Sequence, residues 1–272
     1  MFKKIISPAI LLMLFSFDLR EIEQNAKQDT KIEKIQALPF NLGETAVYSA
    51  FLGDLVVVEA TVKLDAKMHQ INARSCFKAN SKVKTVGLVS FLGTINSSFT
   101  SYIDDNIMPQ KNKLNANEGK YIRNQETDFD YPKGEATVFD MDERNSKKYP
   151  FSFGTHDALS AFYAFRNINF ATLKENETKE INIFAEGKVS KLILKYLGKR
   201  TIKTAFGDKE TLLFQPIFPE KTTNDMERDA EREVERVSVR MWVLADGSHL
   251  PVKVVARGKK GTFKVELKSF KP

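Results

Sequence analysis

The chain has 272 residues, of which 42% are hydrophobic and 28% are charged, with a formal net charge of +7 at pH 7. This is enough apolar material for one large folded domain, and it excludes a chain that is disordered throughout. One cysteine excludes a disulfide framework, and three histidines without short metal-ligand spacing indicate no metal site and no cofactor.

The first twenty residues predict the compartment. Lys3 and Lys4 precede an apolar stretch at residues 5–17, which is shorter than the roughly twenty residues that a membrane-spanning helix needs. A basic start followed by a short apolar segment is typical of a secretory signal peptide, although Ser16-Phe17-Asp18 lacks the usual small-x-small cleavage pattern. We therefore expect residues 1–20 to be a signal peptide and the protein to be exported, for example to the periplasm. The alternative is an uncleaved N-terminal anchor.

Polarity and charge define the next part of the chain. Residues 21–37 are polar and predict a linker before one folded domain at residues 38–272, in which no stretch predicts an integral membrane span. The lysines are scattered through alternating segments, which is typical of solvated faces and does not indicate nucleic acid as a partner. An anionic envelope surface is the less favoured partner of such a basic chain.

Alternation of apolar and polar residues predicts strands along most of the folded part. The turn signals Gly53-Asp54, Glu186-Gly187 and Asp246-Gly247 predict hairpins between successive strands. The predicted strands, in chain order, are 46–51, 55–64, 69–74, 99–103, 121–129, 135–140, 181–184, 189–197, 201–205, 210–215, 237–244, 250–257 and 262–268. This pattern predicts a mainly β fold, a single large antiparallel curved sheet or barrel-like domain with one or two short helices.

Two helices are predicted. Residues 157–167 have an apolar stripe, and Thr155 or Asp157 could cap the start of this helix. Residues 224–236 carry a narrow apolar stripe among alternating glutamates and arginines, which is typical of a solvated cover and could also present a docking surface. Residues 81–92 fit either a short helix or a strand.

The first predicted helix supplies the candidate binding residues. Asp157, Ser160, Tyr163 and Arg166 follow one another at intervals of three and share one helical face. One interpretation is a helix docked on the sheet with its polar groups satisfied locally. The other is a polar cluster at the mouth of a barrel that orients the headgroup of a ligand.

The aromatic residues also have two interpretations. The 21 phenylalanines can fill a large β core, or they can line a concave interior that takes an apolar ligand. Trp242, in the middle of a predicted strand, belongs to the core or to the wall of such a cavity, and we include it among the candidate ligand-binding residues. The buried-filler interpretation is preferred for Cys76.

A catalytic role has weak support. His156 and Asp157 are adjacent and precede Ser160, which suggests a hydrolase, but adjacency in sequence is not the ordered hydrogen-bond geometry of a triad. Because no nucleophile elbow, phosphate loop or dinucleotide motif is present, we assign no catalytic residue.

Several segments together resemble an exported bacterial family known as domain of unknown function 3108. The segments that carry the resemblance are Phe40-Asn41-Leu42-Gly43-Glu44 with Tyr48, Ser101-Tyr102-Ile103-Asp104 with Met108-Pro109, the set Asp157, Ser160, Tyr163 and Arg166, Tyr196-Leu197-Gly198-Lys199-Arg200, Gln215-Pro216, Met241-Trp242-Val243, and Asp246 with Leu250-Pro251-Val252. The resemblance covers residues 38–272 and implies export and a β-rich fold, with no catalytic residues to carry over. The charged residues 222–236 replace the short turn that is usual in the family, which puts any shared ligand or partner at that rim in doubt.

These observations lead to one expected function and two alternatives. We expect an exported cell-envelope protein that binds or carries an apolar or amphiphilic molecule, such as a lipid, without catalysis. The first alternative is an envelope interaction module that contacts a protein partner through sheet edges or residues 224–236. The weaker alternative is a hydrolase centred on His156 and Ser160.

Overall fold

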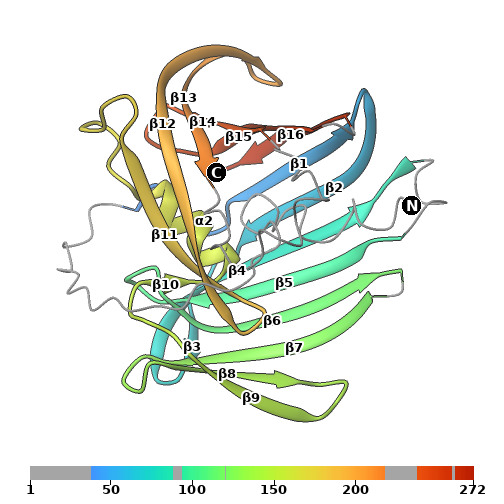
Figure 1. Ribbon diagram of the computed structural model, residues 1–272, viewed down its shortest axis with the longest axis vertical. Helices are drawn as coiled ribbons and strands as arrows, with labels where there is room; N and C mark the ends of the chain where they lie inside the picture. Colours follow the sequence, from blue (N-terminus) through green and yellow to red (C-terminus); the bar gives the residue numbers. More distant parts are fainter. Residues whose placement is uncertain (1–37, 88–93, 120, 218–237, 259–260) are drawn as a thin grey trace, which may run out of the picture.

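The computed structural model describes residues 38–87, 94–119, 121–217, 238–258 and 261–272 (Figure 1). Its strands are β1 (Thr45–Leu52), β2 (Leu55–Leu64), β3 (His69–Ile71), β4 (Arg74–Thr85), β5 (Asn96–Ile103), β6 (Pro109–Glu118), β7 (Tyr121–Asp130), β8 (Glu135–Asp140), β9 (Asn145–Pro150), β10 (Thr155–His156), β11 (Thr178–Ala185), β12 (Lys188–Thr204), β13 (Gly207–Ile217), β14 (Ser238–Leu244), β15 (Pro251–Gly258) and β16 (Gly261–Lys271). The described residues form one helix, α2 (Ala158–Arg166).

The strands form a single sheet in the order β10-β11-β12-β13-β14-β15-β16-β1-β2-β4-β5-β6-β7-β8-β9, and β3 pairs with β4 beside this path. Neighbouring strands are antiparallel, as predicted, at every pairing except that of β10 with β11. The parallel pairing of β10 with β11 corrects the prediction and involves two residues, Thr155 and His156, opposite Asn182 and Ile183. It occurs because the chain crosses over through α2 between the two strands.

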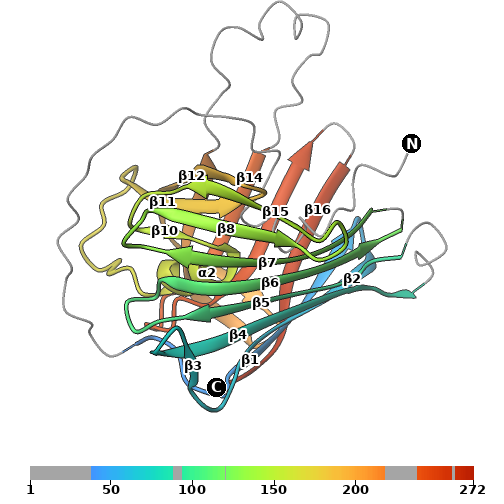
Figure 2. The same cartoon turned by 90° about the horizontal axis from the view of Figure 1, so that it is seen from below.

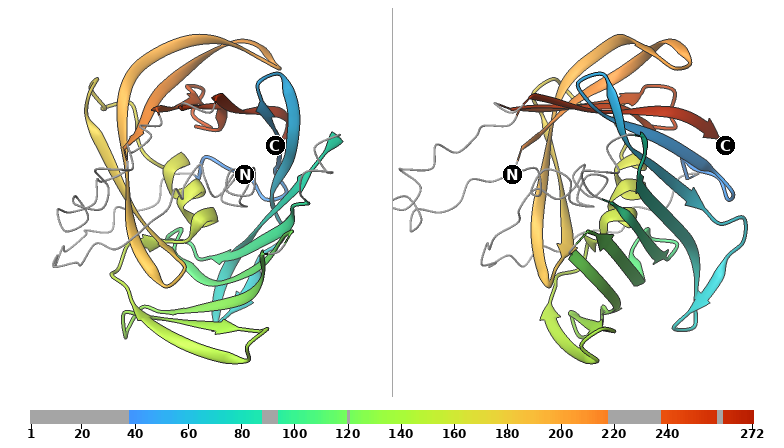
Figure 3. Two further views of the ribbon diagram at one scale, coloured as in Figure 1. Left: turned by 45° about the vertical axis from the view of Figure 1, so that its right-hand side comes forward. Right: turned by 90° about the vertical axis from the view of Figure 1, so that its right-hand side faces the viewer.

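The sheet curves strongly around α2. Figure 3 shows the strands arranged around the helix, and Figure 2 shows β4 to β8 side by side as one wall of the domain. The helix lies on the concave face, where Leu159, Phe162 and Phe165 pack into the main core with residues from most of the strands. Burial of this apolar surface is the main stabilising term of such a fold.

The two ends of the sheet meet through side chains. The ring of Phe184 in β11 lies 5.6 Å from that of Phe129 in β7 and 6.2 Å from that of Tyr149 in β9, measured between centroids. Arg123 of β7 forms an ion pair of 3.1 Å with Glu186, in the turn between β11 and β12. We call these five side chains, Phe129, Phe184, Tyr149, Arg123 and Glu186, the seam. Among the described strands, no hydrogen-bonded ladder joins β9 to β10, so the sheet is not closed into a barrel.

The seam joins opposite faces of the sheet. Thr127 pairs with Val138 on one side and with Asn112 on the other, and the side chain of Asn112 bonds to Asp157 at the start of α2. Phe129 lies two residues after Thr127 and therefore on the same face. Phe129 is therefore on the helix-facing side of β7. Phe184 follows Ile183, a member of the core around α2, and so points away from the helix. The strands β7 to β9 thus overlap the outside of β11 and β12.

Most of the strand predictions are confirmed, including the hairpins at Gly53-Asp54 and Glu186-Gly187 and the C-terminal meander. Two predicted strands differ in detail, and β6, β9 and β10 lie where no strand is predicted. The predicted strands 189–197 and 201–205 are one long strand, β12, with an irregularity of register between Tyr196 and Lys199. The predicted strand 69–74 is a tight hairpin of β3 and β4. The predicted helix at 224–236 lies outside the described residues, and residues 81–85 are part of β4.

Candidate functional site

The start of α2 is fixed by Asp157. Its side chain accepts a hydrogen bond of 2.8 Å from the backbone nitrogen of Ser160, and the hydroxyl of Ser160 accepts one of 2.8 Å from the backbone nitrogen of Asp157. This reciprocal pattern is a capping box, which satisfies amide groups that the first turn of a helix leaves free. It confirms the helix that the sequence predicts and assigns its cap to Asp157.

The same carboxylate ties the helix to the sheet. Oδ2 of Asp157 accepts hydrogen bonds from Oγ of Ser101 in β5, at 2.6 Å, and from Nδ2 of Asn112 in β6, at 3.2 Å. Burial raises the pKa of Asp157, while the bonds from Ser101, Ser160 and Asn112 lower it. With a relative exposure of 0%, the carboxylate is a buried anchor between the helix and two strands.

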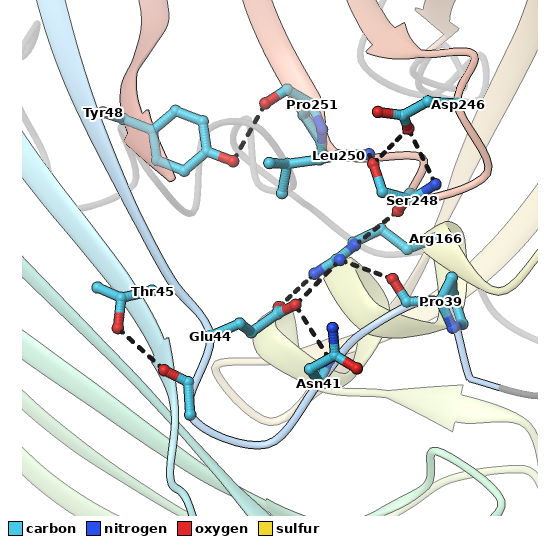
Figure 4. A network of polar contacts seen from close by, with 11 residues as sticks. Pro39, Asn41, Glu44, Thr45, Tyr48, Arg166, Asp246, Ser248, Leu250 and Pro251 are labelled. Atoms are coloured by element: carbon cyan, nitrogen blue, oxygen red, sulfur yellow. Dashed lines mark hydrogen bonds and ion pairs between the residues drawn. The ribbon is translucent and has the colours of Figure 1, made fainter. Parts of the chain in front are cut away.

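Arg166 fixes the other end of the helix (Figure 4). Its guanidinium forms a two-pronged ion pair with Glu44, just before β1, and donates to the backbone oxygens of Pro39 at 2.9 Å and Ser248 at 3.0 Å. Nδ1 of His249 lies 2.7 Å from the backbone oxygen of Arg166. The arginine therefore joins three segments that are distant in sequence: the residues before β1, the end of α2 and the turn between β14 and β15.

Tyr163 lies between these two ends of the helix. Its ring packs edge-on against Phe40, with centroids 4.8 Å apart, and burial raises its pKa well above the ordinary value. Tyr48, which faces the same interior, donates a hydrogen bond of 3.1 Å to the backbone oxygen of Pro251, and its pKa is also raised by burial. Asp157, Ser160, Tyr163 and Arg166 do share one side of α2, and each has a relative exposure of 0–1%. Their contacts are those of a helix docked on the sheet.

Trp242 lies apart from these four residues. Its neighbour Met241 pairs with Phe214, whose ring lies 5.4 Å from Phe165 on the helix, so Met241 faces α2. Trp242 therefore lies on the other face of β14, opposite Leu213 in β13. The structure does not bring Trp242 together with the polar residues of the helix.

The hydrogen bonds that a catalytic triad requires are not found among the described residues. The hydroxyl of Ser160 accepts a hydrogen bond from the backbone nitrogen of Asp157 and donates one to the backbone oxygen of the same residue. The carboxylate of Asp157 accepts hydrogen bonds from Ser101 and Asn112. Nδ1 of His156 is buried without a hydrogen-bond partner, and burial lowers the pKa of this histidine to about 4. The geometry gives the hydrolase alternative no support, because the serine has no base beside it.

A second candidate site lies on the helix-facing side of the sheet, towards the opposite end of the strands. Leu52, Ala256 and Phe263 are apolar and only partly buried there, and we call them the open-end surface. Phe263 pairs with both Leu52 and Ala256 in neighbouring strands.

Burial changes sharply along these three strands. The residue two positions nearer to α2 is buried in each case, with relative exposures of 4% for Ala50, 7% for Val254 and 4% for Val265. Apolar side chains therefore stay accessible beyond the helix on β1, β15 and β16, whereas Val83 and Ile95, at the same end of the sheet, have relative exposures of 4% and 3%. Sequence alternation identified Phe263 as apolar on one face, but its meeting with Leu52 depends on strand order, which the sequence does not reveal.

Across the described ranges, no group of three histidine, cysteine or acidic side chains could hold a metal ion. No helix in this part of the chain is long and apolar enough to cross a membrane.

One solved structure supports the fold. A β-barrel-like protein of domain of unknown function DUF1849 from Brucella abortus has a similar structure, with a TM-score of 0.55 and 8% sequence identity over 86% of this chain and 99% of that chain. A protein with a YmcC-like fold from Bacteroides fragilis NCTC 9343 aligns with a TM-score of 0.33 and 10% identity over 86% of this chain and 98% of that one. No curated protein sequence matches the chain. The family model described as protein of unknown function (DUF3108) matches residues 47–268, and the chain therefore belongs to this family.

Proposed function

We propose that this protein is exported to the cell envelope and binds an apolar or amphiphilic molecule on the concave face of its sheet, without catalysis. The observation that carries the proposal is the open-end surface, where apolar side chains stay accessible on a face that is otherwise buried. The basic and apolar leader at residues 1–20 supports export. The polar contacts of α2 support the proposal indirectly, because they hold the helix at one end of the concave face.

The energetics favour an apolar partner. Complete burial of a leucine or phenylalanine side chain contributes about 1.5–3 kcal/mol, so Leu52 and Phe263 together could supply several kcal/mol of binding free energy. The polar groups of Asp157, Ser160 and Arg166 form hydrogen bonds within the protein, whereas the buried hydroxyl of Tyr163 has no hydrogen-bond partner among the described residues. We assign all four residues a positioning role. Trp242, on the opposite face of β14, is not part of the proposed surface.

A titration with a dansyl-labelled fatty acid tests the proposal. Replacing Leu52 or Phe263 by serine should weaken binding by roughly 10- to 100-fold, the equivalent of about 1.5–3 kcal/mol. The matched control is Phe206→Ser, because Phe206 lies in the β12–β13 turn with 41% exposure and is absent from the open-end surface. Equal affinity in all three variants, or no binding by the unchanged protein, would overturn the proposal.

The edge strand β9 favours the second candidate function, an interaction module. Its residues are almost all exposed, and its outer backbone groups could pair with a strand of a partner protein. Lys147 and Lys148 in the same strand are, however, the kind of charged residues that protect a sheet edge from such pairing. We therefore place the interaction module second.

A further inference from the structure

Exposed apolar side chains also occur at the turns of the sheet. Leu55 begins β2 with 50% exposure, Ile122 lies in the second position of β7 with 63%, and Met141 follows β8 with 41%. All three adjoin a hairpin turn, and none of them belongs to either apolar core. We call Leu55, Ile122 and Met141 the rim residues.

The rim residues lie at the same end of the sheet as the open-end surface. The strands β2, β4, β5, β6, β7 and β8 are successive antiparallel neighbours, so the start of β2, the start of β7 and the end of β8 share one end. Figure 1 shows the β1–β2, β6–β7 and β8–β9 turns together at this end, with α2 lying further back along the strands. Leu52 and Phe263 lie at the same end, close to the β1–β2 and β15–β16 turns.

We propose that this end of the sheet docks on a lipid bilayer, with the rim residues inserted into the interfacial layer. The inference rests on the proposed function, since it identifies the membrane as the source or destination of the apolar ligand. In this orientation the open-end surface faces the lipid, and the polar contacts around Arg166 lie at the end that stays in water. An amphiphilic molecule could then pass between bilayer and concave face without crossing bulk water.

The spacing of the rim residues favours a lipid surface over a protein partner. Three strands separate β2 from β7 in the sheet, which places Leu55 roughly 20 Å from Ile122 along its curve. Separate apolar side chains on different turns do not form the continuous packed centre that is typical of a protein interface. A bilayer can take up each of these side chains independently, and each transfer from water contributes its own favourable free energy.

Charge gives additional support. The chain carries a net charge of +7, which complements a bilayer that contains anionic lipids. Arg144, in the turn that contains Met141, is exposed, but Asp142 and Glu143 accompany it. Because the local charges are mixed, the apolar side chains should contribute more to docking than any electrostatic attraction.

Fluorescence quenching by brominated lipids tests this orientation directly. The full chain would carry Cys76→Ala, which removes its one native thiol, and an environment-sensitive dye on Met141→Cys. The matched control carries the dye on Met68→Cys, at the β2–β3 connection near the opposite end, where the native side chain is similarly exposed at 37%. Vesicles of phosphatidylethanolamine and phosphatidylglycerol with brominated acyl chains should strongly quench the dye at position 141 and leave that at position 68 unchanged.

Quenching at position 68, equal quenching at both positions or quenching at neither would overturn the docking proposal. This readout does not depend on any membrane affinity of the apolar leader, because both proteins contain it. As a second measurement, the triple variant Leu55→Ser, Ile122→Ser, Met141→Ser should lose vesicle-dependent transfer of the dansyl-labelled fatty acid at least tenfold. If this variant still binds the fatty acid in solution, loss of transfer concerns docking alone. Unchanged transfer would contradict the proposal, and absence of binding in the unaltered protein would contradict the proposed function instead.

Discussion

Arg166 is the residue on which the closed end of the fold depends. It is almost completely buried, and it contacts Glu44, Pro39 and Ser248 while its charge lies within 6 Å of three aromatic rings. A buried charge is tolerated only when its hydrogen bonds and its partner are complete. The sequence suggests Arg166 as a ligand contact, which stays a prediction, and the structure shows its guanidinium held by contacts inside the protein.

Replacement of Arg166 by methionine should therefore strongly destabilise the folded protein. It leaves the carboxylate of Glu44 buried without its partner, and we expect the free energy of unfolding to fall by about 3–5 kcal/mol. Urea denaturation followed by circular dichroism measures this change. As a control, Lys191→Met removes an exposed ion pair with Glu180 and should cost less than about 1 kcal/mol. Similar losses in the two variants would contradict the role given to Arg166.

His156 predicts a dependence of stability on pH. Burial lowers its pKa in the folded protein to about 4, from an ordinary value of 6.5, although a backbone hydrogen bond with Ile107 opposes the shift. Between these two values the unfolded chain binds more protons at this site than the folded protein does. The histidine thus contributes stability that is fully present above pH 6.5 and is lost as the pH falls towards 4.

The variant His156→Gln isolates this contribution. Because of this histidine, the free energy of unfolding of the unaltered protein should decrease by up to about 1.4 kcal/mol per pH unit as the pH is lowered from 6 to 4.5. The variant should show a correspondingly shallower slope in urea denaturations at these pH values. The explanation fails if both proteins have the same slope, or if His156→Gln makes it steeper.

At the scale of elements, the seam between β7–β9 and β11–β12 replaces the hydrogen bonds that would close a barrel. Phe184 is central to it, because its ring contacts both Phe129 and Tyr149. Gly187, in the adjoining turn, has a positive φ of 77°, and an added Cβ there would lie 2.5 Å from the ring of Tyr149. The seam is thus closely packed although no strand pairing supports it.

Truncation of Phe184 to alanine should lower the free energy of unfolding by about 3 kcal/mol, since it leaves a cavity in a small buried cluster. The same substitution at the exposed Phe206 should change stability by less than about 0.5 kcal/mol. Thermal or urea unfolding of both variants provides the comparison. A loss at Phe184 no larger than that at Phe206 would show that the seam does not stabilise the fold.

An element can be predicted from sequence when the residues that stabilise it are close to it in the chain, and not when they are distant. The strand β16 alternates clearly and α2 has its cap in sequence, so both are predictable from local residues. The strand β6 was not predicted, because its helix-facing positions include Asn112, whose polar side chain is satisfied only by Asp157 across the interior. The strand β9 is almost entirely exposed and polar, and it owes its conformation to pairing with β8.

For the whole molecule, the sequence predicts a curved sheet. It predicts neither the overlap of β7 to β9 on the outside of β11 and β12 nor the accessible apolar residues of the open-end surface. The overlap depends on contacts such as that between Phe129 and Phe184, which are 55 positions apart in the chain and on opposite faces of the sheet. Likewise, the candidate residues of α2 could be identified by their spacing, but Glu44, the partner of Arg166, could not be identified from any local pattern. Strand order determines which residues meet, and it becomes known only with the structure.

We propose that the concave face holds an apolar or amphiphilic molecule at the open-end surface. Native mass spectrometry of the protein purified from the cells that produce it, with and without organic extraction, can detect that molecule. We expect an additional mass that extraction removes and that is strongly reduced in the double variant Leu52→Ser, Phe263→Ser, but not in Phe206→Ser. A native mass equal to that of the bare chain, or an additional mass that is unchanged in the double variant, would contradict this proposal.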